Sequence, residues 1–166
     1  MIVELYRRVD LAVTDWMARY GITILRVSLG VIFFWFGILK FFPGLSPATA
    51  LAGRTVEAIT GGLVGPGMGV MILAAWEVLI GLGLLTGVAM RATLALLFVQ
   101  MLGTITPLFF FPNELFTRFP YAPTLEGQYI IKNAVLVSAA IVIGATVRGG
   151  GLVADAAAVE AERQRQ

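Results

Sequence analysis

Four apolar stretches of similar length run through this sequence and limit what it can fold into. They cover about residues 22–42, 68–90, 92–111 and 129–147. An α-helix needs about 20 residues to cross the ~30 Å hydrocarbon core of a bilayer, and each stretch has about that length. Lipid also demands that every backbone polar group be satisfied within the segment. The pattern therefore predicts an all-α membrane protein, a bundle of four transmembrane helices.

The composition agrees with this fold class and excludes several kinds of chemistry. Apolar residues make up 58% of the chain and charged residues only 13%, whereas a soluble domain carries about 25% charged residues. The net charge of +2 offers no long basic patch, so we expect no nucleic-acid partner. Cysteine and histidine are both absent. We therefore predict no metal site, and any redox function would need a quinone, a flavin or a partner subunit.

The chain divides into three parts. Residues 1–21 show apolar residues at helical spacing, including Trp16 and Tyr20, with charged residues on the other face. This indicates an amphipathic interfacial helix lying on the membrane, with packing against a partner protein as the alternative. Residues 22–147 form the predicted transmembrane domain, and residues 148–166 a polar cytoplasmic tail.

The connections differ in character. A very tight turn around Met90 and Arg91 joins the second and third stretches as an antiparallel hairpin. Residues 43–67 are rich in proline and glycine, with a short helix predicted around 48–59. The aromatic segment 112–128 is expected to fold back on the bundle or to insert at the membrane interface.

The arginine distribution predicts the orientation of the chain. Only Arg54 and Arg118 lie in the two longer connections. The opposite side has seven arginines, at positions 7, 8, 19, 91, 148, 163 and 165. Because cytoplasmic loops carry the excess of positive residues, both termini are predicted to be cytoplasmic.

Ionisable residues at membrane depth are costly, so each is a candidate for function. A first set falls on one face of the first helix: Arg26, Gly30, Phe33, Gly37 and Lys40. A second set is predicted to share a face of the second helix: Glu77, Gly81, Leu84, Val88 and Arg91. The glycines allow close helix packing, and Gly83 with Gly87 adds a second such face.

Lys40, Glu77 and Lys132 are all predicted to fall in the outer half of the bundle, where Glu77 should contact Lys40, Lys132 or both. One interpretation is a structural ion pair that sets helix register. The other is a pocket in which Glu77 handles a proton and a lysine polarises a carbonyl or an anion. Gln100, Thr104 and Thr106 would line this pocket or simply hydrogen-bond between helices. The full set of candidate site residues is Arg26, Lys40, Glu77, Gln100, Glu126, Lys132 and Asn133.

Three motifs resemble the DoxX-like family of small four-helix bacterial membrane proteins. The first is Arg-x-x-x-Gly-x-x-Phe-x-x-x-Gly-x-x-Lys over residues 26–40, and the second starts at Glu77 and runs through Gly81, Leu85 and Gly87 to Arg91. The third covers residues 126–133 and is similar to the start of the last helix in that family. The resemblance spans about residues 22–147.

The resemblance implies a location in the inner membrane, but it does not imply a particular reaction or catalytic residue. The family is named after a subunit of thiosulfate:quinone oxidoreductase, and other relatives have links to oxidative-stress complexes. We expect an accessory or anchoring subunit of a membrane complex, not a stand-alone enzyme. The alternatives are a quinone-binding oxidoreductase subunit with its pocket near Glu77, and a small transporter of a weak acid or proton.

The expected ligands and partners follow from the same interpretation. No covalently bound cofactor is expected, and the non-covalent candidates are quinone and lipid. The expected partners are the lipid bilayer and either other membrane subunits or further copies of this chain.

Overall fold

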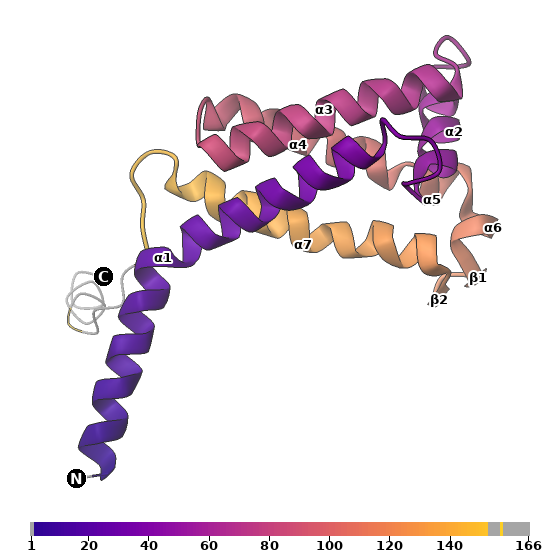
Figure 1. The fold of residues 1–166 in the computed structure, drawn as a ribbon. Helices are drawn as coiled ribbons and strands as arrows, with labels where there is room; N and C mark the ends of the chain where they lie inside the picture. The colour runs from indigo at the N-terminus through magenta and orange to yellow at the C-terminus, as the bar shows by residue number, and fades with distance from the viewer. Residues whose placement is uncertain (1, 153–156, 158–166) are drawn as a thin grey trace, which may run out of the picture.

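The computed structural model describes residues 2–152 and 157, and within this part the chain is helical as predicted (Figure 1). The remaining residues of the predicted tail lie outside the described part. The elements, in chain order, are α1 (Ile2–Leu39), α2 (Thr49–Ile59), α3 (Pro66–Thr86), α4 (Met90–Ile105), α5 (Pro107–Phe110), α6 (Pro112–Leu115), β1 (Phe116–Arg118), β2 (Ala122–Pro123) and α7 (Leu125–Thr146).

Within the described residues, four helical segments are long and apolar enough to cross a membrane. They are Arg8–Leu39, Pro66–Thr86, Met90–Phe110 and Leu125–Thr146. The third segment joins α4 to α5, which begins at Pro107. Proline cannot donate a backbone hydrogen bond, so the helix is interrupted there without ending the span. The predicted four-helix membrane fold is confirmed.

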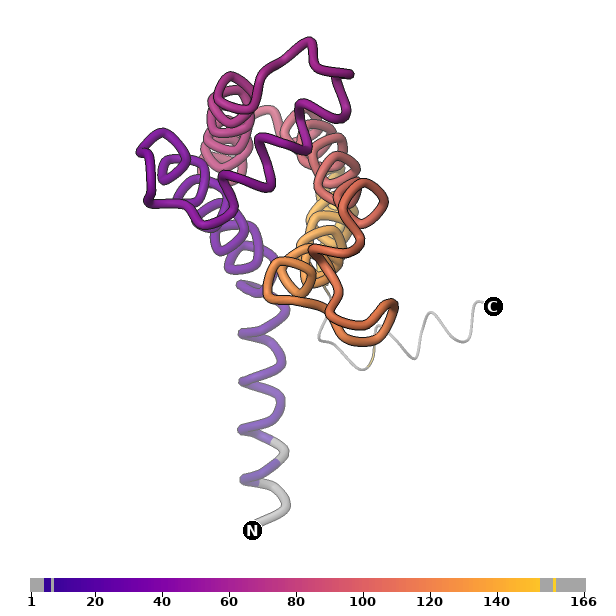
Figure 2. Tube along the Cα trace, turned by 90° about the vertical axis from the view of Figure 1, so that its right-hand side faces the viewer, coloured from indigo at the N-terminus to yellow at the C-terminus, as the bar shows by residue number. Residues whose placement is uncertain are grey.

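The four long helices surround a common core (Figure 2). Each helix contacts two neighbours, in the order α1, α3, α4, α7 and back to α1. The core contains Leu29, Phe33, Ile80, Leu84, Leu94, Leu97, Met101, Ala139, Ala140 and Ile143. Large apolar residues such as Leu79, Leu102 and Val135 are exposed on the outer surface. A surface of this kind is stable in lipid and not in water, which agrees with a bilayer environment.

Glycines set how closely α1 approaches α3. A Cβ atom on Gly37 would lie 2.9 Å from the Cβ of Glu77 and from the backbone nitrogen of Val78. A Cβ on Gly81 would overlap the backbone of Phe34. Gly30 likewise lies against Leu85. The predicted packing role of these glycines is confirmed, because any larger residue would push the helices apart.

The turn between α3 and α4 lies earlier than predicted. Helix α3 ends at Thr86, and Gly87 follows in the left-handed conformation with φ of 75°. Its backbone N–H donates to the carbonyl of Gly83 at 2.9 Å. Gly83 itself packs against Thr93 of α4, as its predicted packing role requires. Gly87 instead ends the helix. Its left-handed conformation is free of strain for glycine but strained for most other residues.

This turn corrects the predicted face of the second helix. Arg91 lies in the first turn of α4, so it shares no helix with Glu77, and Val88 lies in the turn. The apolar run continues unbroken through residues 88–90, and hydropathy therefore did not reveal the turn.

Helix α1 continues through the predicted boundary at residue 21. It runs without interruption from Ile2 to Leu39, and its first part projects away from the bundle (Figures 1 and 2). No helix end separates an interfacial segment from a spanning one. Where the projecting part lies relative to the membrane stays a prediction.

The two longer connections fold into defined structure. Helix α2 confirms the short helix predicted around residues 48–59. Strands β1 and β2 pair antiparallel, with Phe116 opposite Pro123. This small hairpin was not predicted. Strand β2 leads into α7. The backbone N–H of Thr124 donates to the carbonyl of the fully buried Leu115 at 2.8 Å. The segment therefore folds back on the start of α7.

Candidate functional site

Lys40, Glu77 and Gln100 form a buried polar cluster contributed by three elements. The Lys40 Nζ lies 2.5 Å from Oε2 of Glu77, and the two side chains are only 9% and 12% exposed. Gln100 of α4 donates from Nε2 to Oε1 of the same carboxylate at 2.9 Å. The expected contact between Glu77 and Lys40 is confirmed. Both carboxylate oxygens are engaged, which reduces the cost of holding the charge at this depth.

The backbone explains why these side chains meet. Lys40 directly follows the last residue of α1, and its Nζ also donates to the carbonyl of Phe36 at 3.4 Å. This carbonyl lies in the last turn of the helix, where a cation is favourable. The close approach at Gly37 brings the base of Glu77 next to α1. A glycine one turn before the lysine therefore makes room for the carboxylate.

Gln100 has one atom that the cluster leaves unused. Its side chain is 5% exposed, and Oε1 has no hydrogen-bond partner among the described residues. Its Nε2 donates to the Glu77 carboxylate, so the acceptor Oε1 needs a donor from elsewhere. Leaving a buried acceptor unpaired costs about 1–3 kcal/mol.

Arg26 belongs to the opposite end of the bundle. Its Nη1 donates to the carbonyls of Leu84 and Leu85, the latter at 3.1 Å, in the last turn of α3. These carbonyls have no backbone N–H donor from a following helical turn, because α3 ends at Thr86. Arg26 therefore caps α3 and takes no part in the cluster around Glu77.

The remaining predicted site residues do not join the cluster. Lys132 and Glu126 are exposed, Asn133 is half-buried, and no ion pair joins Lys132 to Glu77 within the described chain. The buried residues of α7 are Gly127 at its start and three residues between 139 and 143. The first half of α7 is therefore mostly exposed, and the alternative that Lys132 contacts Glu77 is wrong.

The two threonines of the third span are satisfied locally. Thr104 Oγ1 donates to the carbonyl of Met101 at 2.9 Å, and Thr106 Oγ1 donates to that of Gly103 at 2.7 Å. Both bonds stay within their own chain segment, so neither threonine forms the expected bond between helices.

Another ion pair, absent from the sequence prediction, links the two longer connections. Arg54 of α2 donates from Nη1 to Oε1 of Glu114 at 2.9 Å and from Nη2 to Oε2 at 2.5 Å. The guanidinium also lies 5.0 Å from the ring centre of Phe111. The hydrogen bond from Arg54 lowers the pKa of Glu114 below its usual value. Sixty residues separate the partners, and each connection contains more than one charged residue, so the sequence did not indicate which of them pair.

Comparison with known proteins identifies a family. The DoxX family model matches residues 21–113, which is more than half of the chain. The matched region contains Lys40, Glu77 and Gln100, and it ends before α7. No curated protein and no solved structure matches the chain.

Proposed function

The chain belongs to the DoxX family, and from that premise we propose that it is an accessory or anchoring subunit of a membrane protein complex. The proposal rests on the first part of α1, up to about Tyr20, which projects from the bundle. It extends beyond the bundle (Figure 1), and large apolar side chains from Leu5 to Tyr20 are exposed along its described part. Among the residues whose burial is described, none before Leu25 belongs to the bundle core or packs against it, so this segment does not contribute to that core.

The projecting segment has the pattern of a docking helix. Leu5, Val9, Trp16 and Tyr20 recur at helical spacing and are all exposed. Asp15 and Arg19 form an ion pair at 3.4 Å on the other face. An amphipathic helix with an uncovered apolar stripe packs on another surface, and a partner subunit next to the bundle supplies one.

Lys132 adds an independent argument for a protein partner. It is exposed and lies seven residues after the start of α7, so about 10 Å into that span. A lysine at this depth is costly in lipid unless it snorkels to the surface or pairs with an acidic group. A partner helix carrying a carboxylate would satisfy it.

Photo-crosslinking in native membranes tests the proposal. A photoreactive amino acid replaces Trp16, and the matched control replaces Leu102, which is also exposed but lies on the bundle. We expect one discrete protein adduct from position 16, identified by mass spectrometry and recovered in constant ratio to this chain, and none from position 102. The adduct should weaken when Lys132 is changed to Met. Lipid adducts alone at position 16 would contradict a subunit role.

Quinone binding beside Glu77 is the second candidate function, and one observation favours it. The buried Oε1 of Gln100 lacks a donor among the described residues, and the hydroxyl of a quinol is a donor of the right kind. The Lys40 ammonium next to it suits the carbonyl of the oxidised form. The proposal is that a quinol bound there bonds to Gln100.

Ligand-induced thermal stabilisation tests this second candidate. Decylubiquinol should raise the melting temperature of the wild type and not that of Gln100→Leu. Thr104→Val is the matched control, because Thr104 lies on the same segment and bonds only to Met101. Equal shifts in the wild type and Gln100→Leu would refute quinol binding at this place.

A further inference from the structure

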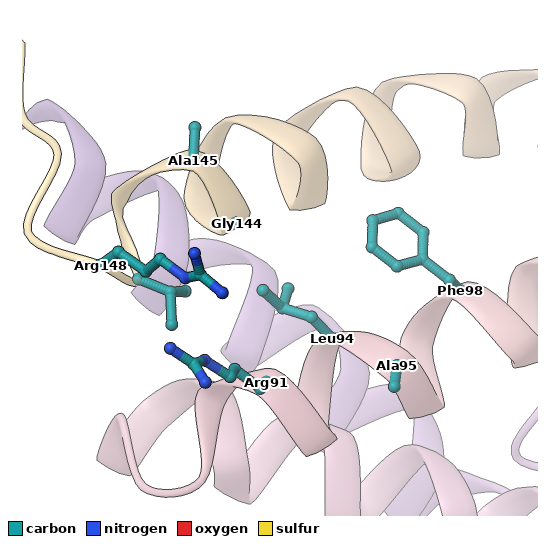
Figure 3. Close-up of a pocket in the computed structure, with 8 residues that line it drawn as sticks. Arg91, Leu94, Ala95, Phe98, Gly144, Ala145 and Arg148 are labelled. Carbon is teal, nitrogen blue, oxygen red and sulfur yellow. The ribbon is translucent and has the colours of Figure 1, made fainter.

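A surface groove between α4 and α7 is lined by two arginines that take no part in the functions proposed above. Its volume is about 360 Å³. Figure 3 shows the guanidinium groups of Arg91 and Arg148 pointing into the same opening, with Leu94 beside them. Ala95 and Phe98 continue the lining along α4, and Gly144 does so on α7. The groove is therefore cationic at one end and apolar along its length.

The electrostatics of this end favour an anion. No hydrogen bond or ion pair to a carboxylate is formed by Arg91 or Arg148 within the residues that the structure describes. Two cations that face one opening repel each other, and an anion between them removes that repulsion. Arg91 lies in the first turn of α4, where no acidic residue and no side-chain cap offset the positive helix end.

The position of the arginines along the spans identifies the source of the anion. Arg91 is the second residue of the span that begins at Met90, and Arg148 lies two residues after the span that ends at Thr146. Both therefore lie where the hydrocarbon core meets the lipid headgroups. A ligand that is anionic at this level and apolar below it is a phospholipid.

We propose that this groove binds one anionic glycerophospholipid. The phosphodiester lies between Arg91 and Arg148, each of which offers paired N–H donors suited to phosphate oxygens. An acyl chain lies along Leu94 and Phe98, and the small residues Ala95 and Gly144 leave space for it. Zwitterionic lipids bind more weakly, because their own ammonium group opposes the arginines.

Native mass spectrometry of the full chain in mild detergent tests the proposal by lipid titration. Phosphatidylglycerol should bind at least about tenfold more tightly than phosphatidylcholine, as expected for two arginines near the membrane surface. The double variant Arg91→Gln/Arg148→Gln should lose this preference. The single variant Arg148→Gln should weaken binding severalfold, while Arg118→Gln, an equal charge loss in the outer hairpin, should change it less than twofold.

Two further experiments distinguish a lipid-binding site from a site for other anions. Ala95→Phe leaves every charge in place and adds bulk at an exposed position of the groove, so it should weaken phosphatidylglycerol binding. Inorganic phosphate at millimolar concentration should not displace the lipid. Displacement by phosphate, equal binding in Arg148→Gln and Arg118→Gln, or a lipid-free dimer that the double variant abolishes would each overturn the proposal.

Discussion

Replacing Lys40 with Met should destabilise the bundle far more than replacing Glu77 with Gln, although both changes remove the same ion pair. Lys40→Met deletes the 2.5 Å contact to Glu77 and leaves a carboxylate that is 12% exposed with only the Gln100 amide as partner. Breaking a buried pair in this way costs about 3–5 kcal/mol of the free energy of unfolding.

Glu77→Gln has a milder consequence. The amide is neutral and still offers Lys40 an acceptor, while the ammonium keeps its bond to the carbonyl of Phe36. We expect a cost of about 1–3 kcal/mol. The double variant Lys40→Met/Glu77→Gln leaves no buried charge, so it should recover about 2 kcal/mol relative to the sum of the single changes.

Equilibrium unfolding in mixed micelles of a mild detergent and sodium dodecyl sulfate measures these differences. Tryptophan fluorescence reports unfolding, because Trp76 of α3 is half-buried and donates to the carbonyl of Leu96 of α4. Thr104→Val serves as the control. Additive effects of the two single changes, within about 0.5 kcal/mol, would show that Lys40 and Glu77 are not coupled and would refute the reasoning.

Three other predictions concern the helix packing, the Arg54–Glu114 ion pair and the membrane orientation. Gly81→Ala should cost about 1–3 kcal/mol because its methyl group meets helix α1, whereas Gly103→Ala, which meets nothing within 4 Å, should not destabilise; equal unfolding free energies for the two would contradict the packing argument. Because Arg54 lowers the pKa of Glu114, the Glu114→Gln variant should be less stable than the wild type at neutral pH. This difference in stability should vanish as the pH falls through the pKa of Glu114 in the folded protein. A difference that stays constant between pH 7 and 3 would count against the argument. A cysteine introduced at Gly62 should react with an impermeant thiol reagent from outside the cell, and labelling only from the cytoplasmic side would reverse the predicted orientation.

The sequence predicted those features that depend on length and helical spacing. Segment length and hydropathy located all four spans, and the spacing of glycines from Lys40 and Glu77 placed the two charges on facing helices. The error over Lys132 arose because its depth was judged without knowing how α7 packs. Its spacing puts it on the side of Ala139 and Ile143, which are buried, but the first half of α7 has few neighbours.

Two other pairings between distant segments could not be predicted from the sequence. Arg91 and Arg148 line the same groove because α4 and α7 are neighbours in the bundle, and nothing in the local sequence around either arginine indicates that α4 and α7 are neighbours. The pair between Arg54 and Glu114 depends in the same way on how two irregular connections fold over one end of the bundle.

The charged residues of this protein fall into two groups, those that have partners within the described chain and those that do not. The buried carboxylate of Glu77 has partners for both oxygens within the chain, which suits a role in fixing α1 against α3. Lys132 lies within a span and the arginines of the groove lie at the ends of spans, and the described part of the chain supplies no carboxylate to any of the three. Peripheral charges of this kind gain their counterion only from lipid or from another subunit. If the protein acts by association, variants at Glu77 should change its stability and abundance, whereas variants at Lys132, Arg91 and Arg148 should change what it binds and leave its unfolding free energy nearly constant.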